Sequence, residues 1–207
     1  LRMQNPYWIA YRNLRLNQKK RYMLSAQLSY DITDWLNISG RVRVDNTHTK
    51  YEQKLYASSN LTITEESTQG HYTISKPDET QTYADVLANI NKRFNDFSLV
   101  ANVGASIVNN RYEDLSYRGP IREKGIPNVF NVFDLDNTKK KARQDEWQEQ
   151  TQSVFASVEV GWKSMLYLTL TGRNDWASQL ANSSTPCFFY PSVGLSGVIS
   201  EMLTLPE

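Results

Sequence analysis

Apolar and polar side chains alternate along most of this chain, and a two-residue period is compatible only with extended strands that carry one set of side chains on each face. Between residues 36 and 45, for example, every even-numbered residue is apolar or glycine and every odd-numbered residue is polar. No long segment has a helical period, and only the short segment 146–152 is predicted as a helix. The chain is therefore predicted to be all-β, with alternating runs at residues 22–30, 36–45, 83–94, 98–110, 154–162, 166–173 and 189–199.

The connections between these runs alternate between short and long. Three links are short turns, whereas the links at residues 46–82, 111–151 and 174–187 are long. Loops longer than ~12–15 residues are uncommon in compact domains. Outer-membrane barrels, in contrast, join their strands by short periplasmic turns and long extracellular loops. Aromatic residues lie near both ends of the runs, as interfacial girdles require: Trp35, Phe97 and Trp162 at the short turns, and Tyr30, Tyr83, Trp176 and Phe189 near the long links.

Composition is consistent with this architecture and excludes several classes of function. No window approaches the ~18 consecutive apolar residues of a membrane-spanning helix, but a spanning strand needs only ~9–11 residues with one apolar face. The 23 Lys and Arg residues nearly balance the 22 Asp and Glu residues, so no nucleic-acid partner is expected. One cysteine, Cys187, and two histidines, His48 and His71, predict neither a disulfide nor a metal site. No cofactor is expected.

Alternation by itself also fits a soluble all-β ligand-binding module that uses its long loops for recognition. The pattern of short and long connections favours the barrel. Bacterial single-chain barrels have an even number of strands, at least eight, whereas about seven are found here. The predicted fold is thus an antiparallel transmembrane β-barrel segment, an incomplete barrel in which residues 1–207 form part of one barrel domain.

Four stretches carry a family resemblance: residues 5–8 (Asn-Pro-Tyr-Trp), residues 34–41, residues 168–176, which contain Gly-Arg-Asn-Asp-Trp, and residues 188–193, which contain Phe-Tyr-Pro-Ser-Val. In order and spacing they resemble the barrel region of SusC/RagA-type TonB-dependent outer-membrane transporters of Bacteroidetes. The most specific part is the pair formed by the last two stretches. The family-motif residues are Asn5, Pro6, Tyr7, Trp8, Gly172, Arg173, Asn174, Asp175, Trp176, Phe189, Tyr190, Pro191 and Ser192.

This resemblance implies energised import of oligosaccharides or peptides across the outer membrane of a Gram-negative, Bacteroidetes-like cell. It implies contact with membrane lipid, with a SusD-like surface lipoprotein that acts as a lid, and with the TonB complex. The family's plug domain, TonB box and barrel ends have no counterpart among these residues, so the chain is expected to be a fragment of a longer receptor. The family motifs are expected to reflect loop architecture more than ligand chemistry.

The polar faces of two runs are the candidates for a wet barrel lumen, because an arginine on the lipid face at mid-bilayer costs ~2–4 kcal/mol. Their commoner role is that of wall residues bonded to neighbours. We expect the following side chains to face the lumen: Arg41, Arg43, Asp45, Asn89, Asn91 and Arg93.

Segments 117–122 and 128–134 mix aromatic and hydrogen-bonding groups, which suits stacking on a sugar or peptide and equally suits a loop that folds onto itself. The candidate loop contacts are Tyr117, Arg118, Arg122, Phe130 and Phe133. No motif places a nucleophile or a carboxylate pair for catalysis, so the chain is not predicted to be an enzyme.

Overall fold

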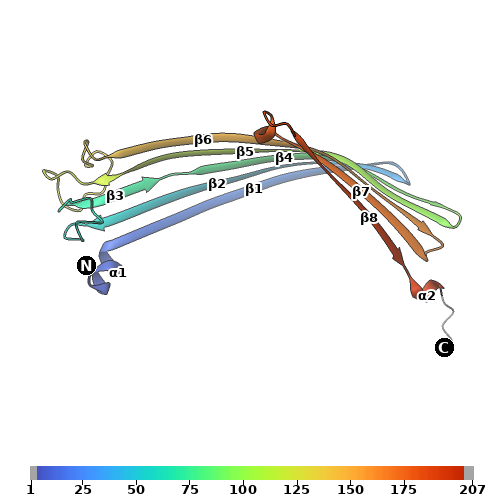
Figure 1. Cartoon of the computed structure of the whole chain (residues 1–207), viewed down its shortest axis with the longest axis horizontal. Helices are drawn as coiled ribbons and strands as arrows, with labels where there is room; N and C mark the ends of the chain where they lie inside the picture. Colours follow the sequence, from blue (N-terminus) through green and yellow to red (C-terminus); the bar gives the residue numbers. More distant parts are fainter. Residues whose placement is uncertain (1–3, 203–207) are drawn as a thin grey trace. The chain divides into compact units, whose positions relative to one another are not determined.

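The computed structural model describes residues 4–202, and it confirms the all-β antiparallel fold (Figure 1). Within these residues one sheet contains eight strands. None of the helices in this part of the chain is long and apolar enough to cross a membrane. The elements are α1 (Pro6–Arg12), β1 (Asn13–Thr33), β2 (Leu36–Tyr56), β3 (Gly70–Ser75), β4 (Asp78–Phe94), β5 (Phe97–Pro120), β6 (Lys141–Trp162), β7 (Leu166–Ala177), the 3-10 helix η1 (Ser178–Leu180), β8 (Cys187–Gly197) and α2 (Ile199–Met202).

The strand order is β1-β2-β3-β5-β6-β7-β8, and β4 also pairs with both β2 and β5. β3 and β4 therefore occupy the same position in the sheet, end to end between β2 and β5. They are separated by Lys76 and Pro77, and proline has no N–H group to donate to a neighbouring strand. The predicted count of about seven strands corresponds to seven places in this order, and the eighth strand is β3, which lies in a region predicted to be a loop.

The short turns are confirmed, but the predicted bounds of the long loops are wrong. The turns occupy residues 34–35, 95–96 and 163–165, and the longer connections occupy only residues 57–69, 121–140 and 178–186. Segment 146–152 is not a helix but part of β6. Sequence alternation ends where both faces of a strand become polar, yet backbone N–H and C=O groups there still require partners, so pairing continues beyond the alternating runs.

The described residues divide into two compact units. The first unit contains residues up to Tyr22, Asn46–Thr80 and Arg111–Trp147, and the second unit contains Met23–Asp45, Gln81–Asn110 and the residues from Gln148 onward. Five strands, β1, β2, β4, β5 and β6, have residues in both units, and β3 belongs wholly to the first. β7 and β8 belong wholly to the second.

In the second unit, strand register collects the apolar side chains on one face. Val158 pairs with Leu170 and Leu170 with Val193, and the next row contains Val160, Leu168 and Leu195. Directly paired residues of an antiparallel sheet lie on the same face. Most of these side chains are exposed, Val193 to 73% and Leu195 to 77%. The second unit thus presents a continuous apolar face to its surroundings.

In the first unit, the two longer connections form a small core against the strands. Leu55, Tyr72, Ile121 and Leu135 are buried, and Ile121 forms an isolated β-bridge with Leu135. The buried Ser67 hydroxyl donates to the backbone oxygen of Ile121 over 2.7 Å. The connections therefore have fixed internal contacts of their own.

Gly70, at the start of β3, should tolerate no side chain. Its φ of +114° lies in the region that favours glycine, and an added Cβ would lie 2.5 Å from the Leu55 backbone oxygen. We expect Gly70→Ala to destabilise the packed connections by about 1–3 kcal/mol, measured as faster proteolysis of segment 57–69 in the full-length protein. The control Gly194→Ala, whose Cβ meets Thr169 atoms only at 3.8 and 4.0 Å, should leave cleavage unchanged. Equal cleavage of the two variants would contradict the prediction.

Candidate functional site

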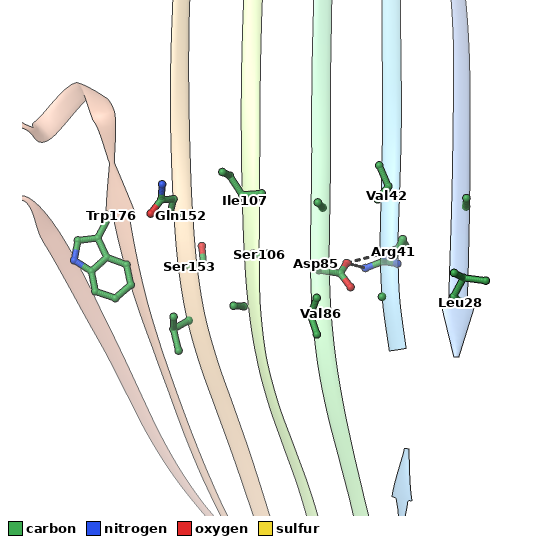
Figure 2. Close-up of a pocket in the computed structure, with 15 residues that line it drawn as sticks. Leu28, Arg41, Val42, Asp85, Val86, Ser106, Ile107, Gln152, Ser153 and Trp176 are labelled. Atoms are coloured by element: carbon green, nitrogen blue, oxygen red, sulfur yellow. Dashed lines mark hydrogen bonds and ion pairs between the residues drawn. The ribbon is translucent and has the colours of Figure 1, made fainter. Parts of the chain in front are cut away.

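A polar cluster links β2 and β4 in the second unit. Figure 2 shows the side chains of Arg41 and Asp85 directed toward one another. Both Arg41 Nε and Arg41 Nη2 donate to Asp85 Oδ2, over 2.9 and 2.7 Å. The guanidinium groups of Arg41 and Arg43 lie over the Tyr83 ring, 5.3 and 5.2 Å from its centroid, and Arg43 Nη2 donates to Gln81 Oε1. Two arginines are thus held side by side by a carboxylate, an amide and one aromatic ring.

The other polar residues expected to face the lumen are held less tightly. Asn89 Nδ2 donates to Asn37 Oδ1 over 3.2 Å, and the backbone N–H of Asn91 donates to the Trp35 carbonyl. Asp45 is half-buried and Arg93 is exposed. The structure therefore brings Arg41 and Arg43 together, whereas Asn89 belongs to a separate amide cluster and Arg93 to neither. Their orientation toward a lumen stays a prediction.

The same unit contains a cavity of about 610 Å³, most of whose lining is small or aliphatic, including Leu28, Val42, Val86 and Ile107 (Figure 2). Such a lining offers few hydrogen-bonding groups, so the cavity belongs to the apolar face of this unit.

Cys187 is half-buried and free. Among the residues that the structure describes, no group of three or more His, Cys, Asp or Glu side chains is arranged to hold a metal ion.

The two most specific family motifs lie side by side as neighbouring strands. The register of β7 and β8 pairs Gly172 with Pro191, and one residue further along each strand it pairs Arg173 with Tyr190. A Cβ on Gly172 would approach the Phe189 ring to 3.3 Å, so the glycine leaves room for that ring. The same ladder also pairs Thr171 with Ser192, Asn174 with Phe189, Asp175 with Phe188 and Trp176 with Cys187.

Arg173 is the centre of a polar network within these motifs. Its Nε donates to Asp175 Oδ1 over 2.8 Å, its Nη2 donates to Ser153 Oγ over 3.0 Å, and its guanidinium lies 5.7 Å from the centroid of Phe155. These contacts join β6 to β7 and leave the motif residues bonded to one another. They agree with an architectural role for the motifs.

The N-terminal motif forms the start of α1. Asn5 caps the helix, since its Oδ1 accepts from the Tyr7 N–H over 2.9 Å and Pro6 occupies the first helical position. Trp8 Nε1 donates to the buried Ser59 hydroxyl, which in turn donates to Asn13 Oδ1, each over 3.0 Å. The motif therefore fastens α1 to the 57–69 connection. The Asn-Pro pair was the sequence signal for this helix start, and sequence reasoning did not use it.

The candidate loop contacts separate into three environments. Tyr117 and Arg118 lie in β5 rather than in a loop, so their side chains point to opposite faces. Phe130 packs edge-on against Tyr56, with ring centroids 5.0 Å apart, and Arg122 pairs with Asp134 over 2.8 Å. Phe133 is 91% exposed. Arg122 thus holds the connection to itself, whereas Phe130 packs the connection against β2.

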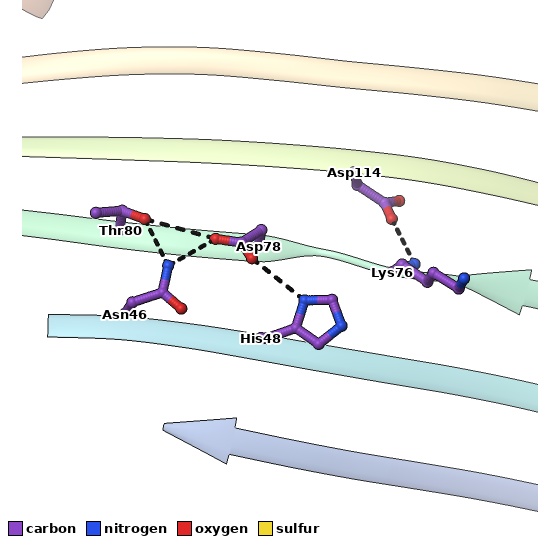
Figure 3. Close-up of polar contacts among 6 residues, drawn as sticks. All are labelled: Asn46, His48, Lys76, Asp78, Thr80 and Asp114. Carbon is purple, nitrogen blue, oxygen red and sulfur yellow. Dashed lines mark hydrogen bonds and ion pairs between the residues drawn. The ribbon is translucent and has the colours of Figure 1, made fainter. Parts of the chain in front are cut away.

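Sequence reasoning missed a polar cluster around the break between β3 and β4 (Figure 3). Asn46 Nδ2 donates to Asp78 Oδ1 and to Thr80 Oγ1, over 2.8 and 2.7 Å. His48 Nδ1 lies 3.2 Å from Asp78 Oδ2, and the Lys76 backbone N–H donates to Asp114 Oδ1. These side chains satisfy polar groups where regular pairing is interrupted. The proline at position 77 was the only signal of the break.

The first unit also contains a polar cavity of about 600 Å³, which sequence reasoning also missed. Its ionisable lining residues come from four separate segments: Arg15, Glu65, His71 and Arg118. The His71 side chain is only 7% exposed, and its Nε2 lies 3.6 Å from Glu65 Oε1. Burial lowers the pKa of His71 below 6.5, and the nearby Glu65 carboxylate offsets this only in part. His71 is therefore neutral at neutral pH.

Comparison with known proteins identifies the family. The chain matches the model described as TonB dependent receptor-like, beta-barrel, over residues 2–198. No curated protein sequence matches it. The RagAB peptide transporter is 15% identical, with a TM-score of 0.76 over 96% of this chain and 22% of that chain. The RagAB peptide importer in its open-open state is 16% identical, with a TM-score of 0.71 over 93% of this chain and 21% of that chain. The siderophore receptor PiuA from Acinetobacter baumannii is 14% identical, with a TM-score of 0.53 over 89% of this chain and 30% of that chain.

At these identities the likeness to solved structures shows the fold. The chain spans between about a fifth and a third of the length of those proteins, 22% of the RagAB transporter chain and 30% of PiuA. The predicted resemblance to SusC/RagA-type transporters is confirmed at the level of the fold, since both RagAB structures superpose with higher TM-scores than PiuA does. Because the family model covers nearly all of its residues, the chain belongs to the TonB-dependent receptor-like β-barrel family.

Proposed function

We propose that this chain forms part of the wall of an outer-membrane, TonB-dependent importer of oligosaccharides or peptides. The observation that carries the proposal is the exposed apolar face of the second unit, in which register aligns Val158, Leu170 and Val193 in one row. Membership of a receptor-barrel family agrees with it. A RagAB protein is described as a peptide transporter, which supports a peptide as one substrate class.

The physical argument rests on what surrounds that face. Leu168 is 41% exposed, Leu170 46% and Leu195 77%. Contiguous exposed apolar surface is unfavourable in water, whereas in a bilayer it is the surface that contacts lipid. The opposite face carries hydrogen-bonding side chains such as Thr169 and Glu159, which need water or polar partners. One wet face and one lipid face are the requirements of a barrel wall.

The alternative of a soluble ligand-binding module fits this surface poorly. Such a module would have to cover the exposed leucines and valines of β7 and β8 with a second layer. The described part of the chain contains only one sheet. The barrel wall needs no second layer, because lipid covers the apolar face.

The packed connections of the first unit are the proposed contact for a SusD-like lipoprotein lid. Phe133 is 91% exposed and Ile126 71%, and both lie in the 121–140 connection. Internal contacts such as Arg122 with Asp134 hold this connection in place. An exposed aromatic side chain on a preformed surface is the type of residue that contributes most to binding a partner. Coupling to TonB is proposed from the family alone.

Charge placement on adjacent residues of β7 tests the proposed membrane wall. Leu168→Arg puts a charge on the apolar face and should cost about 2–4 kcal/mol near the bilayer centre. Thr169→Arg puts the same charge on the opposite face, beside the Glu159 carboxylate that Thr169 contacts over 3.1 Å, and should be tolerated. The measurement is the folded fraction of the full-length protein in lipid vesicles, followed by heat-modifiable electrophoretic migration.

The matched control is the same pair of variants refolded in plain buffer. If both variants fold equally well in vesicles, or if the protein folds in plain buffer without lipid or detergent, the membrane-wall proposal is wrong.

Replacement of the exposed aromatic ring tests the proposed lid contact. Phe133→Ser should weaken binding of the purified SusD-like lipoprotein to the full-length protein by about tenfold or more, because an anchoring aromatic side chain is lost. Tyr11→Ser is the control, since Tyr11 is 72% exposed but lies on α1. Unchanged affinity in Phe133→Ser, measured by surface plasmon resonance, would place the lid elsewhere.

A further inference from the structure

The polar cavity of the first unit is built by strand register. Gln53 pairs with Thr73 and Thr73 with Arg118, so these three side chains form one row on one face. Leu55 and His71 pair in an adjacent row of the same face. Arg15 of β1 and Glu65 of the 57–69 connection complete the polar lining, and the cavity holds about 600 Å³. This volume lies within the ~300–1,000 Å³ that is usual for sites of small ligands.

The arginines of this cavity have hydrogen-bonding capacity to spare. Arg118 Nη2 lies 3.6 Å from Glu65 Oε1 and its side chain is 54% exposed. That separation exceeds the ~2.7–2.9 Å of a direct charge-assisted hydrogen bond. A guanidinium carries five N–H donors in a planar fork that matches a carboxylate. Arg118 therefore presents its donors to the cavity without a close acceptor among the described residues.

A second observation points independently to a ligand. His71 is buried, yet its Nδ1 has no hydrogen-bond partner within the part of the chain that the structure describes. Its Nε2 lies 3.6 Å from Glu65 Oε1, too far for a good hydrogen bond. Buried polar atoms are nearly always paired. A buried imidazole whose Nδ1 has no partner and whose Nε2 has only the distant Glu65 carboxylate, in the lining of this cavity, is what a site for a hydrogen-bonding ligand provides.

We propose that this cavity binds a ligand that carries a carboxylate, with the Arg118 guanidinium as its bidentate partner. Two arginines and one glutamate give the lining a net charge of about +1 while His71 is neutral, which matches a singly charged carboxylate better than a dianionic phosphate. His71, Gln53 and Thr73 supply hydrogen bonds for neighbouring hydroxyl or amide groups. Uronic acids and peptide carboxyl termini share this chemistry. The inference rests on the proposed function, since it names the substrate class of the importer.

Isothermal titration of the purified full-length protein in detergent tests the proposal with two matched pairs of probes. The first pair is galacturonate and neutral galactose, and the second is N-acetyl-dialanine and its C-terminal amide. We expect at least one acid to bind about tenfold or more tightly than its neutral counterpart, and the pair that shows the preference identifies the source of the carboxylate. No binding of either acid at millimolar concentration, or equal binding of acid and neutral probes, would overturn the proposal.

Three variants assign the binding to the cavity. Arg118→Gln should weaken acid binding about tenfold or more. Arg118→Lys keeps the positive charge but loses the planar pair of guanidinium donors, so its affinity for the acid should lie between those of Arg118→Gln and the unaltered protein. Glu65→Gln should tighten acid binding, because it removes a competing negative charge. Arg111→Gln is the matched control, since Arg111 also lies in β5 and is 56% exposed but pairs with Glu113 and Glu146 outside the cavity. Equal affinities in the Arg118 and Arg111 variants would refute the assignment.

Two further measurements keep the outcomes distinct. Heat-modifiable migration of each variant shows whether it is folded, and if Arg118→Gln fails to fold, Arg15→Gln takes its place with the same expected loss. Uptake by proteoliposomes is measured separately. Acid binding without uptake contradicts the proposed importer but not the site, whereas uptake of a neutral substrate without acid binding contradicts the site but not the importer.

Discussion

Pairing of the backbone in register is the constraint on which the rest of this structure depends. Every N–H and C=O group in a strand needs a partner, and in a bilayer water cannot supply one. Once strands pair, the two-residue period leaves only two faces, and a shift by one residue would exchange them. The rows Val158–Leu170–Val193 and Gln53–Thr73–Arg118 show the result in each unit: register alone decides which side chains become neighbours.

The two units place their apolar side chains differently. In the second unit, valines and leucines are exposed on one face, and the proposed lipid contact takes the place of a protein core. In the first unit, the connections bury Ile121 and Leu135 almost completely, each to 1% exposure. A connection with such a core holds a defined surface, which allows it to present Phe133 outward and to position Glu65 beside Arg118.

The family motifs gain a physical explanation from these contacts. Gly172 leaves room for the ring of Phe189 on the next strand, and Arg173 bonds to Asp175 and Ser153. Asn5 and Pro6 start a helix that Trp8 fastens to the 57–69 connection. These motif residues are thus engaged by neighbours in the fold. The cavity residues Arg118 and His71 belong to no motif, and both keep unused hydrogen-bonding capacity.

The sequence by itself determined seven of the eight strand-forming segments, the short turns and the separation of polar from apolar faces, because these depend only on local period and turn residues. It also identified the barrel family through the Gly-Arg-Asn-Asp-Trp and Phe-Tyr-Pro-Ser-Val stretches. Only the tertiary structure decided how far the strands extend, since pairing continues where alternation ends. Tertiary structure likewise decided which distant residues meet. Arg15, Glu65, His71 and Arg118 are separated along the chain. They share a cavity only because strand order and register place β1, β3 and β5 on the same sheet, and because the 57–69 connection adds Glu65 to the lining.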